Sequence, residues 1–109
     1  MISINSIWVS QRNLKRASQI SSMVEGLRNS IVLPPILLGR TAENSLRVED
    51  GHHRLAAYWI FGRKLVYNTE YVIVETDWEK PVFGKIDWLL DINKVCCLET
   101  GLISKKKLH

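Results

Sequence analysis

Apolar residues recur three or four positions apart between Lys15 and Ile31, and this spacing predicts an amphipathic helix. Asn13 is the expected N-cap, because a short polar side chain there can accept a hydrogen bond from the first turn. Pro34-Pro35 is expected to end the helix, since the residue before a proline is driven out of the helical conformation. The apolar positions are Ala17, Ile20, Met23, Val24, Leu27 and Ile31.

Short runs of β-branched and apolar residues predict four strands. The first is expected within residues 2–9. Residues 36–38 and the alternating residues 46–48 flank a polar turn, so they are expected to form a hairpin. Residues 71–74 are apolar and mostly β-branched, which is typical of a central strand.

A second helix is predicted over residues 55–61, where apolar side chains again lie one helical turn apart. Gly62 follows at the position where a glycine commonly ends a helix. Pro81 is the expected first residue of a third helix that runs through residues 88–92. The order β-α-β-β-α-β-α predicts a mixed α/β (α+β) fold with a small sheet flanked by helices.

The chain has 109 residues, which fits one domain over residues 1–109, with residues 95–109 expected to form a flexible basic tail. A net charge of +4 suits an anionic ligand. Lys105, Lys106 and Lys107 carry most of this excess, so charge alone does not demand a nucleic-acid partner. The adjacent Cys96 and Cys97 predict neither a disulfide nor a zinc site.

No apolar run approaches the roughly 20 residues that are needed to cross a bilayer, so no membrane partner is expected. The N-terminus has no basic region followed by a long apolar stretch, and no secretion signal is therefore expected. Together these features predict a cytoplasmic location.

The turn Asp50-Gly51-His52-His53-Arg54 gathers unusual chemistry at a predicted strand-to-helix junction. The first N–H groups of a helix lack internal partners and carry partial positive charge, so this end of a helix attracts anions. Gly51 permits a sharp turn and a close approach, and Arg54 can hold a phosphate through two hydrogen bonds. His52 and His53 add imidazole donors, and Asp50 is a candidate ligand for a magnesium ion that bridges phosphates.

The same turn also has a purely structural interpretation. Asp50 could simply cap the helix, and both histidines could face solvent in its first turn. Arg54 could pair with Glu49 or Asp50. Three nearby cations could extend an anionic site or belong to a solvated surface, and these are Arg40, Arg63 and Lys64.

Residues 50–57 (Asp-Gly-His-His-Arg-Leu-Ala-Ala), followed by Gly62, are similar to the Gly-x-His-Arg-x-x-Ala motif of the ParB N-terminal/sulfiredoxin superfamily. The order of features before the motif resembles that family as well: a first strand, Gln11-Arg12, an amphipathic helix and the run at residues 35–38. The resemblance covers residues 2–66. It implies a ParB/sulfiredoxin-like single domain.

The resemblance also implies that the turn binds a nucleotide. The superfamily includes CTP-binding partition proteins, ATP-using sulfiredoxins, a free-serine kinase, plasmid proteins with ATPase and nuclease activity, and ADP-ribosylating toxins. Their common element is a nucleotide phosphate chain, or a dinucleotide pyrophosphate, held at the Gly-x-His-Arg turn. Gly51, His53 and Arg54 are the phosphate-binding residues that this implies. The Asp-Gly-His-His-Arg string is most similar to that of the serine kinase, whose aspartate assists phosphoryl transfer.

Three departures from the family narrow the expected activity. Sulfiredoxins place a reactive cysteine where this chain has His52, so reduction of a sulfinic acid is not expected. The serine kinase uses a glutamate before its first helix, whereas Ser10, Gln11 and Arg12 stand there, so serine phosphorylation is not expected either. With 109 residues and without the further domains of a partition protein, the chain is not expected to act as a complete partition protein.

The leading hypothesis is a small NTPase or phosphotransferase that binds ATP or CTP with Mg²⁺. Asp50, His52 and His53 are its catalytic candidates. Gly51, His52, His53 and Arg54 are its phosphate-binding candidates, and Asp50 is the candidate metal ligand. One alternative is a plasmid- or virus-encoded DNA-binding or nuclease accessory protein that uses the basic tail. Others are an ADP-ribosylating toxin and an inactive module that only binds a partner.

Overall fold

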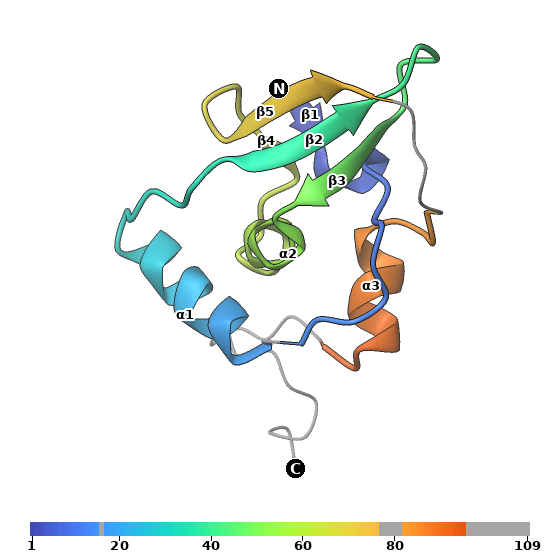
Figure 1. The fold of residues 1–109 in the computed structure, drawn as a ribbon. Helices are drawn as coiled ribbons and strands as arrows, with labels where there is room; N and C mark the ends of the chain where they lie inside the picture. The colour runs from blue at the N-terminus through green and yellow to red at the C-terminus, as the bar shows by residue number, and fades with distance from the viewer. Residues whose placement is uncertain (16, 77–81, 96–109) are drawn as a thin grey trace.

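The structure is a computed structural model, and it describes residues 1–15, 17–76 and 82–95. They build a mixed α+β domain with three α-helices and two small sheets, which confirms the predicted fold class (Figure 1). The elements are β1 (Ile2–Ser3), the 3-10 helix η1 (Ile4–Ser6), α1 (Ala17–Arg28), β2 (Ile36–Arg40), β3 (Leu46–Asp50), α2 (His52–Ile60), β4 (Leu65–Val66), β5 (Tyr71–Glu75) and α3 (Ile86–Ile92).

The larger sheet has three strands in the order β3-β2-β5. β2 and β3 form the predicted antiparallel hairpin, and β5 runs parallel to β2. The prediction that residues 71–74 form a strand is confirmed, but the prediction that this strand is central is wrong. β5 lies at the edge, where Val72 is 50% exposed and Val74 is 39% exposed. An apolar β-branched run fits an edge strand and a central strand equally well, so its composition could not distinguish them.

The predicted first strand is divided into three parts. β1 pairs with β4, a short strand that the sequence did not predict. The chain then turns through η1 and continues along the free side of β3, where the Trp8 N–H donates to Leu46 O at 2.9 Å and the Val48 N–H donates to Trp8 O at 2.9 Å. The segment around Trp8 therefore covers the outer edge of β3.

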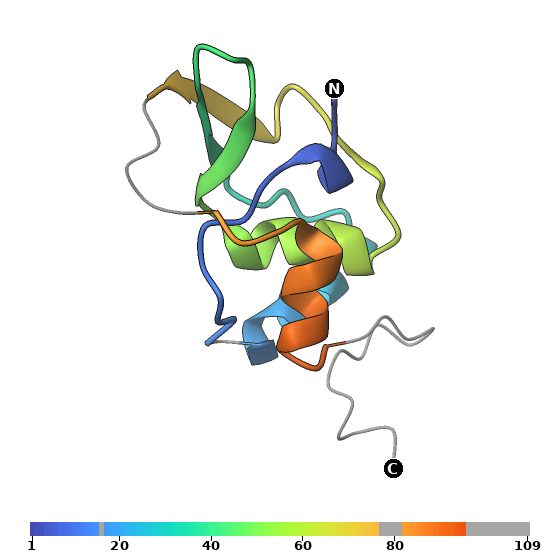
Figure 2. The ribbon, with the colours of Figure 1, turned by 90° about the vertical axis from the view of Figure 1, so that its right-hand side faces the viewer.

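Helix α2 lies at the centre of the molecule, between the larger sheet and the other two helices (Figures 1 and 2). It contacts α1, α3 and β2. Leu55, Ala56, Ala57 and Tyr58 on this helix are at most 1% exposed, so it is buried on most of its surface. The helix that carries the candidate site is thus fixed by packing on several sides.

The first helix ends earlier than the sequence predicted. Ser30 has a positive φ of 62°, its N–H donates to Leu27 O at 3.1 Å, and the Ile31 N–H donates to Gly26 O at 2.9 Å. These bonds form a Schellman motif, which ends α1 before Pro34-Pro35 is reached. Asn13 is not the N-cap, because α1 begins at Ala17.

The end of the second helix agrees with its prediction. Gly62 has a φ of 104°, and its N–H donates to Trp59 O at 3.0 Å. The Arg63 N–H donates to Tyr58 O at 2.9 Å, which completes a second Schellman motif. The helix begins at His52, three residues before the predicted start, so the candidate turn includes its first residues.

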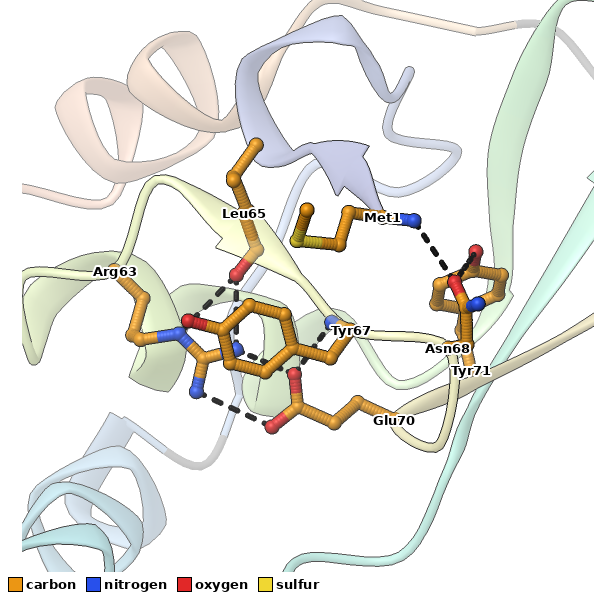
Figure 3. A network of polar contacts seen from close by, with 7 residues as sticks. All are labelled: Met1, Arg63, Leu65, Tyr67, Asn68, Glu70 and Tyr71. Carbon is orange, nitrogen blue, oxygen red and sulfur yellow. Dashed lines mark hydrogen bonds and ion pairs between the residues drawn. The ribbon is translucent and has the colours of Figure 1, made fainter.

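A network centred on Arg63 ties the end of α2 to the start of β5 (Figure 3). The Arg63 guanidinium donates to Leu65 O at 3.0 Å and to both carboxylate oxygens of Glu70. Its carbon lies 4.1 Å from the centre of the Tyr67 ring and 5.1 Å from that of Tyr58. The Arg63 side chain is 20% exposed and that of Glu70 is 17% exposed, so this ion pair is largely withdrawn from water.

The chain start joins the same region. The Met1 amino group donates to Asn68 Oδ1 at 2.8 Å, and the Tyr71 hydroxyl donates to the same oxygen at 3.0 Å (Figure 3). The loop between β4 and β5 is therefore held at Asn68 by the chain start and at Glu70 by Arg63.

Two predictions concern the C-terminal part of the chain. Helix α3 runs through residues 88–92 as predicted but begins at Ile86, and Pro81 lies outside the described residues. Val95 is 5% exposed and belongs to the core, so it is not part of a tail. Residues 96–109, with both cysteines and the three lysines, lie outside the described residues. Within the described ranges, no helix is long and apolar enough to span a membrane.

Candidate functional site

Gly51 forms the junction between β3 and α2. Its φ of 114° and ψ of 28° lie in the left-handed region, which glycine enters without the steric cost of a Cβ atom. Gly51 is also the N-cap of α2, and its carbonyl accepts the Leu55 N–H at 2.9 Å. Asp50 is therefore not the N-cap. Because a glycine occupies that position, the cap residue has no side chain to cover the positive end of the helix.

Arg54 is held across this turn by two hydrogen bonds. Its Nη1 donates to Pro35 O at 2.8 Å, and its Nη2 donates to Asp50 Oδ2 at 3.1 Å. The pair with Asp50 confirms one part of the structural interpretation. The Asp50 side chain is 77% exposed, whereas that of Arg54 is 16% exposed. Asp50 and Pro35 thus fix the direction of a guanidinium that also lines the pocket at the turn.

The guanidinium of Arg54 packs directly against the backbone of Gly51. A Cβ atom at Gly51 would lie 3.3 Å from both Arg54 Nε and Arg54 Nη2, and 3.2 Å from Ile36 Cγ2. The turn therefore uses glycine both for its backbone angles and for this close approach.

Replacing Gly51 by alanine is expected to lower the free energy of unfolding by about 1–3 kcal/mol, because alanine is strained at this φ and would press on Arg54. Urea denaturation measures the loss. Gly62→Ala is the matched control, since Gly62 has a similar φ of 104° but no neighbouring atom within 4 Å of an added Cβ. A loss no larger at Gly51 than at Gly62 would show that the contact with Arg54 carries no energy.

His52 lies beneath the turn. It is 5% exposed, and its Nε2 accepts the Ser10 N–H at 3.0 Å. The Ser10 hydroxyl donates to Val48 O at 2.6 Å, which holds Ser10 in place. The pKa of His52 is lowered to about 4, chiefly by burial and to a smaller extent by the nearby His53 and Arg47, against the opposing effect of Asp50 and Glu49.

A neutral His52 does not fit the role of a charged phosphate donor. Because Nε2 accepts a hydrogen bond, the neutral ring carries its proton on Nδ1. The ring joins the first residue of α2 to the loop that begins at Ser10, so the geometry gives His52 a positioning role. This burial also contradicts the structural interpretation in which both histidines face solvent.

Two adjoining pockets lie at the turn and share Gln11 and His53 as lining residues. One has a volume of about 230 Å³ and lies against residues 49–54, with Gln19 and Met23 of α1 on its other side. The second has a volume of about 420 Å³ and is lined mainly by residues 11–13 and Lys15. His53 is thus the histidine that stands between the two spaces.

Residues 11–15 were not predicted as part of the site by their chemistry; Gln11 and Arg12 entered only through the family resemblance. Arg12 and Lys15 bring two cations to the larger pocket. The loop is held by Asn93 at the end of α3, whose Oδ1 accepts the Leu14 N–H at 3.0 Å and whose Nδ2 donates to Arg12 O at 2.9 Å. Two cations in a polar stretch indicate a candidate anion site. The neighbouring sequence does not reveal, however, that this stretch lies beside a turn some forty residues later.

Both acidic side chains at the turn form ion pairs with arginines. Glu49 accepts a hydrogen bond from Arg47 Nε at 2.9 Å, and Asp50 pairs with Arg54. Among the described residues, no three His, Cys, Asp or Glu side chains lie close enough together to hold a metal ion. A magnesium ion that arrives with phosphates needs only one or two protein carboxylates. The exposed Asp50 fits that requirement, and it would have to share its carboxylate with Arg54.

The three cations that could have extended the site do not line either pocket. Arg40 pairs with Glu75 at the far end of the sheet, and Arg63 pairs with Glu70. Lys64 lies 5.5 Å from the centre of the Trp59 ring.

Comparison with known proteins adds no relative: no family model, no curated protein and no solved structure matches the chain.

Proposed function

We propose that the chain binds the phosphate groups of a nucleotide at the turn from Asp50 to Arg54. The observation that carries this proposal is the glycine-capped start of α2, which opens on a pocket beside a fixed guanidinium. A helix N-terminus and an oriented arginine both favour an oxyanion with several acceptor atoms. The resemblance to the ParB N-terminal/sulfiredoxin superfamily supports the same ligand.

Gly51, His53 and Arg54 are the proposed phosphate contacts. The larger pocket then offers room for a second part of the ligand beside Arg12 and Lys15, with His53 between the two parts. A nucleoside triphosphate has this form, because its phosphate chain and its nucleoside are separate recognition elements. A cytoplasmic location, where ATP and CTP are abundant, belongs to this proposal.

Phosphate binding is better supported than phosphoryl transfer. Of the three catalytic candidates, His52 is buried and neutral and Asp50 is bound to Arg54. NTP hydrolysis or transfer would therefore depend on His53 and on an Asp50 that exchanges its partner when Mg²⁺ enters with the phosphates.

The test is calorimetric titration of the chain with ATP, CTP, GTP, ADP and NAD, with and without Mg²⁺. Arg54→Ala is expected to weaken nucleotide binding about 10- to 100-fold, because a charged hydrogen-bond donor to phosphate is lost. Arg28→Ala is the matched control, since Arg28 lies on α1 in an exposed pair with Glu25. No binding by any of these nucleotides, or equal binding by Arg54→Ala, would contradict the proposal. A preference for NAD would favour the ADP-ribosylating alternative.

Asp50→Asn separates the two roles proposed for Asp50. Removal of its charge frees Arg54 and should strengthen nucleotide binding in the absence of Mg²⁺. If Asp50 also holds the metal, the gain in affinity that Mg²⁺ gives to the wild type will disappear in Asp50→Asn. If the gain persists, the metal is held by the nucleotide alone.

One observation favours DNA as a second candidate ligand. Phe83 is 39% exposed and stacks on Trp88 at 5.8 Å between ring centres, and the Arg12 guanidinium carbon lies 5.9 Å from the Phe83 ring. Exposed aromatic rings beside cations are typical of single-strand binding. Affinity for an oligonucleotide that falls steeply with salt, and falls further in Phe83→Ala, would support this candidate. A flat response to salt would count against it.

A further inference from the structure

The outer edge of β5 presents a row of backbone groups. The Ile36 N–H donates to Glu70 O at 2.9 Å, and the Thr76 N–H donates to Arg40 O at 2.9 Å, which fixes the phase of the parallel ladder between β2 and β5. In such a ladder only alternate residues of a strand bond to the same neighbour. Val72 therefore directs its backbone groups toward β2, as does Val74. Tyr71, Ile73 and Glu75 direct theirs away from the sheet.

The two edges of the sheet differ in whether another segment covers them. The edge of β3 is covered by the segment around Trp8, whereas no strand in the described ranges lies against the outer edge of β5. Edge strands are usually protected by proline, by charged side chains or by a bulge. Residues 71–75 (Tyr-Val-Ile-Val-Glu) contain no proline, the parallel register runs without a break, and the one charged residue, Glu75, lies at the end of the strand and is bound by Arg40. The edge is open to pairing.

The outward groups of β5 are complementary to themselves. When a second β5 is placed antiparallel about a two-fold axis at Ile73, the outward residues oppose one another as hydrogen-bonded pairs. Ile73 then faces its own copy, and Tyr71 faces Glu75 of the second copy. No two like charges oppose each other, because the charged Glu75 faces a tyrosine. Arg40 of the same chain also donates to Glu75 Oε1 at 2.9 Å.

The side chains agree with this arrangement. Val72 and Val74 are the exposed apolar residues of the strand, and in this register each Val72 lies directly opposite Val74 of the second copy. Both valines stay on the outer face in both copies, so the two sheets continue into one another with six strands. β5 lies at the opposite edge of the sheet from β3, so this contact leaves the turn at Asp50 open.

We infer that β5 is an association edge, and that its occupant is β5 of a second copy of this chain, paired antiparallel about Ile73. This inference is independent of the proposed nucleotide binding, because it involves neither pocket.

Cysteine cross-linking tests the register directly in a chain with Cys96 and Cys97 replaced by serine. Non-hydrogen-bonded pairs bring Cα atoms to about 4.5 Å, which suits a disulfide. The double variant Val72→Cys/Val74→Cys is therefore expected to oxidise to a covalent dimer. Val72→Cys alone should form little covalent dimer, because the two cysteines would then be diagonal neighbours at about 7–8 Å.

Sedimentation equilibrium supplies the second test. The wild-type mass is expected to rise from 12.6 kDa toward twice that value as concentration increases. Ile73→Pro removes an outward N–H without touching the β2 ladder, and Val72→Lys disrupts both valine pairs; each should weaken association about tenfold or more. Val32→Lys is the control for fold and surface charge, since Val32 is 88% exposed and lies away from the sheet. A wild type that stays monomeric, or a double variant that forms no cross-linked dimer, would overturn the inference.

Discussion

Replacing Arg63 by alanine is expected to lower the free energy of unfolding by about 3 kcal/mol. The change leaves the Glu70 carboxylate, only 17% exposed, without its cationic partner. Although burial tends to raise the pKa of Glu70, the hydrogen bonds from Arg63 and from the Tyr67 N–H outweigh it and hold the pKa below its ordinary value. Leu65 O also loses its guanidinium donor (Figure 3). Urea denaturation at neutral pH measures the loss.

Two further variants show whether the loss at Arg63 comes from the fork of hydrogen bonds or from charge alone. Arg63→Lys keeps the charge but cannot reach Leu65 O and both oxygens of Glu70 together, so it should recover less than half of the stability. Arg28→Ala removes an exposed ion pair and should cost no more than about 0.5 kcal/mol. Equal losses in Arg63→Ala and Arg28→Ala would mean that the network contributes no more than a surface pair.

The protein is expected to lose about 3 kcal/mol of stability between pH 6.5 and pH 4 through His52 alone. In the unfolded chain His52 takes up a proton near its ordinary pKa of 6.5, whereas the folded chain holds that pKa at about 4. Between these values the unfolded state binds more protons, so stability falls as the pH falls. Above pH 6.5 the full contribution is present. Glu70 adds its own loss only below its ordinary value of 4.5, so the slope above pH 5 reports on His52.

Urea denaturation from pH 8 to pH 4 measures this dependence. His52→Gln keeps an acceptor for the Ser10 N–H and removes the titration, so the slope above pH 5 should disappear. His53→Gln is the matched control and should keep most of the slope, because burial, the largest cause of the low pKa, stays in place. A slope that survives in His52→Gln would assign the proton uptake to another group.

The parts of the fold that were predicted correctly depend on local rules. The hairpin of β2 and β3 follows from a polar turn between two apolar runs, and the end of α2 follows from Gly62, a residue that tolerates positive φ. Ser30 also adopts a positive φ, yet serine seldom does so, and the end of α1 was therefore placed too late. Local conformational preferences therefore gave a wrong helix end where a serine occupies the position in the Schellman motif that glycine usually takes.

The remaining errors concern contacts between distant residues. The open edge of β5 depends on the order of strands in the sheet, which Val72 and Val74 do not encode. The loop at residues 11–15 reaches the turn because Asn93 holds it, and Asn93 is separated from Leu14 by 79 residues and from Arg12 by 81. Sequence periodicity carries no information about a bond of that range.

The candidate turn was identified from its residue types, but its two histidines could not be told apart. His52 and His53 are neighbours with the same chemistry, and only the helix phase bonds His52 to Ser10 and places His53 at both pockets. From sequence, Arg54 and Asp50 were each assigned to a ligand, and an ion pair that Arg54 forms with Asp50 or Glu49 was the structural alternative. The structure shows the pair with Asp50, so any anion at Arg54 competes with a carboxylate that is already there.

The two hydrogen bonds between Asn93 and the loop at residues 11–15 have a consequence for the order in which the site is assembled during synthesis. The turn at Asp50 leaves the ribosome well before α3, so a nascent chain carries the anion-attracting helix end without the loop that brings Arg12 beside it. The two hydrogen bonds of the Asn93 amide fix this loop, which forms one wall of the site, only when the last helix docks. A ligand that needs both walls would then favour the docked form, and its uptake would report that the C-terminal helix has arrived.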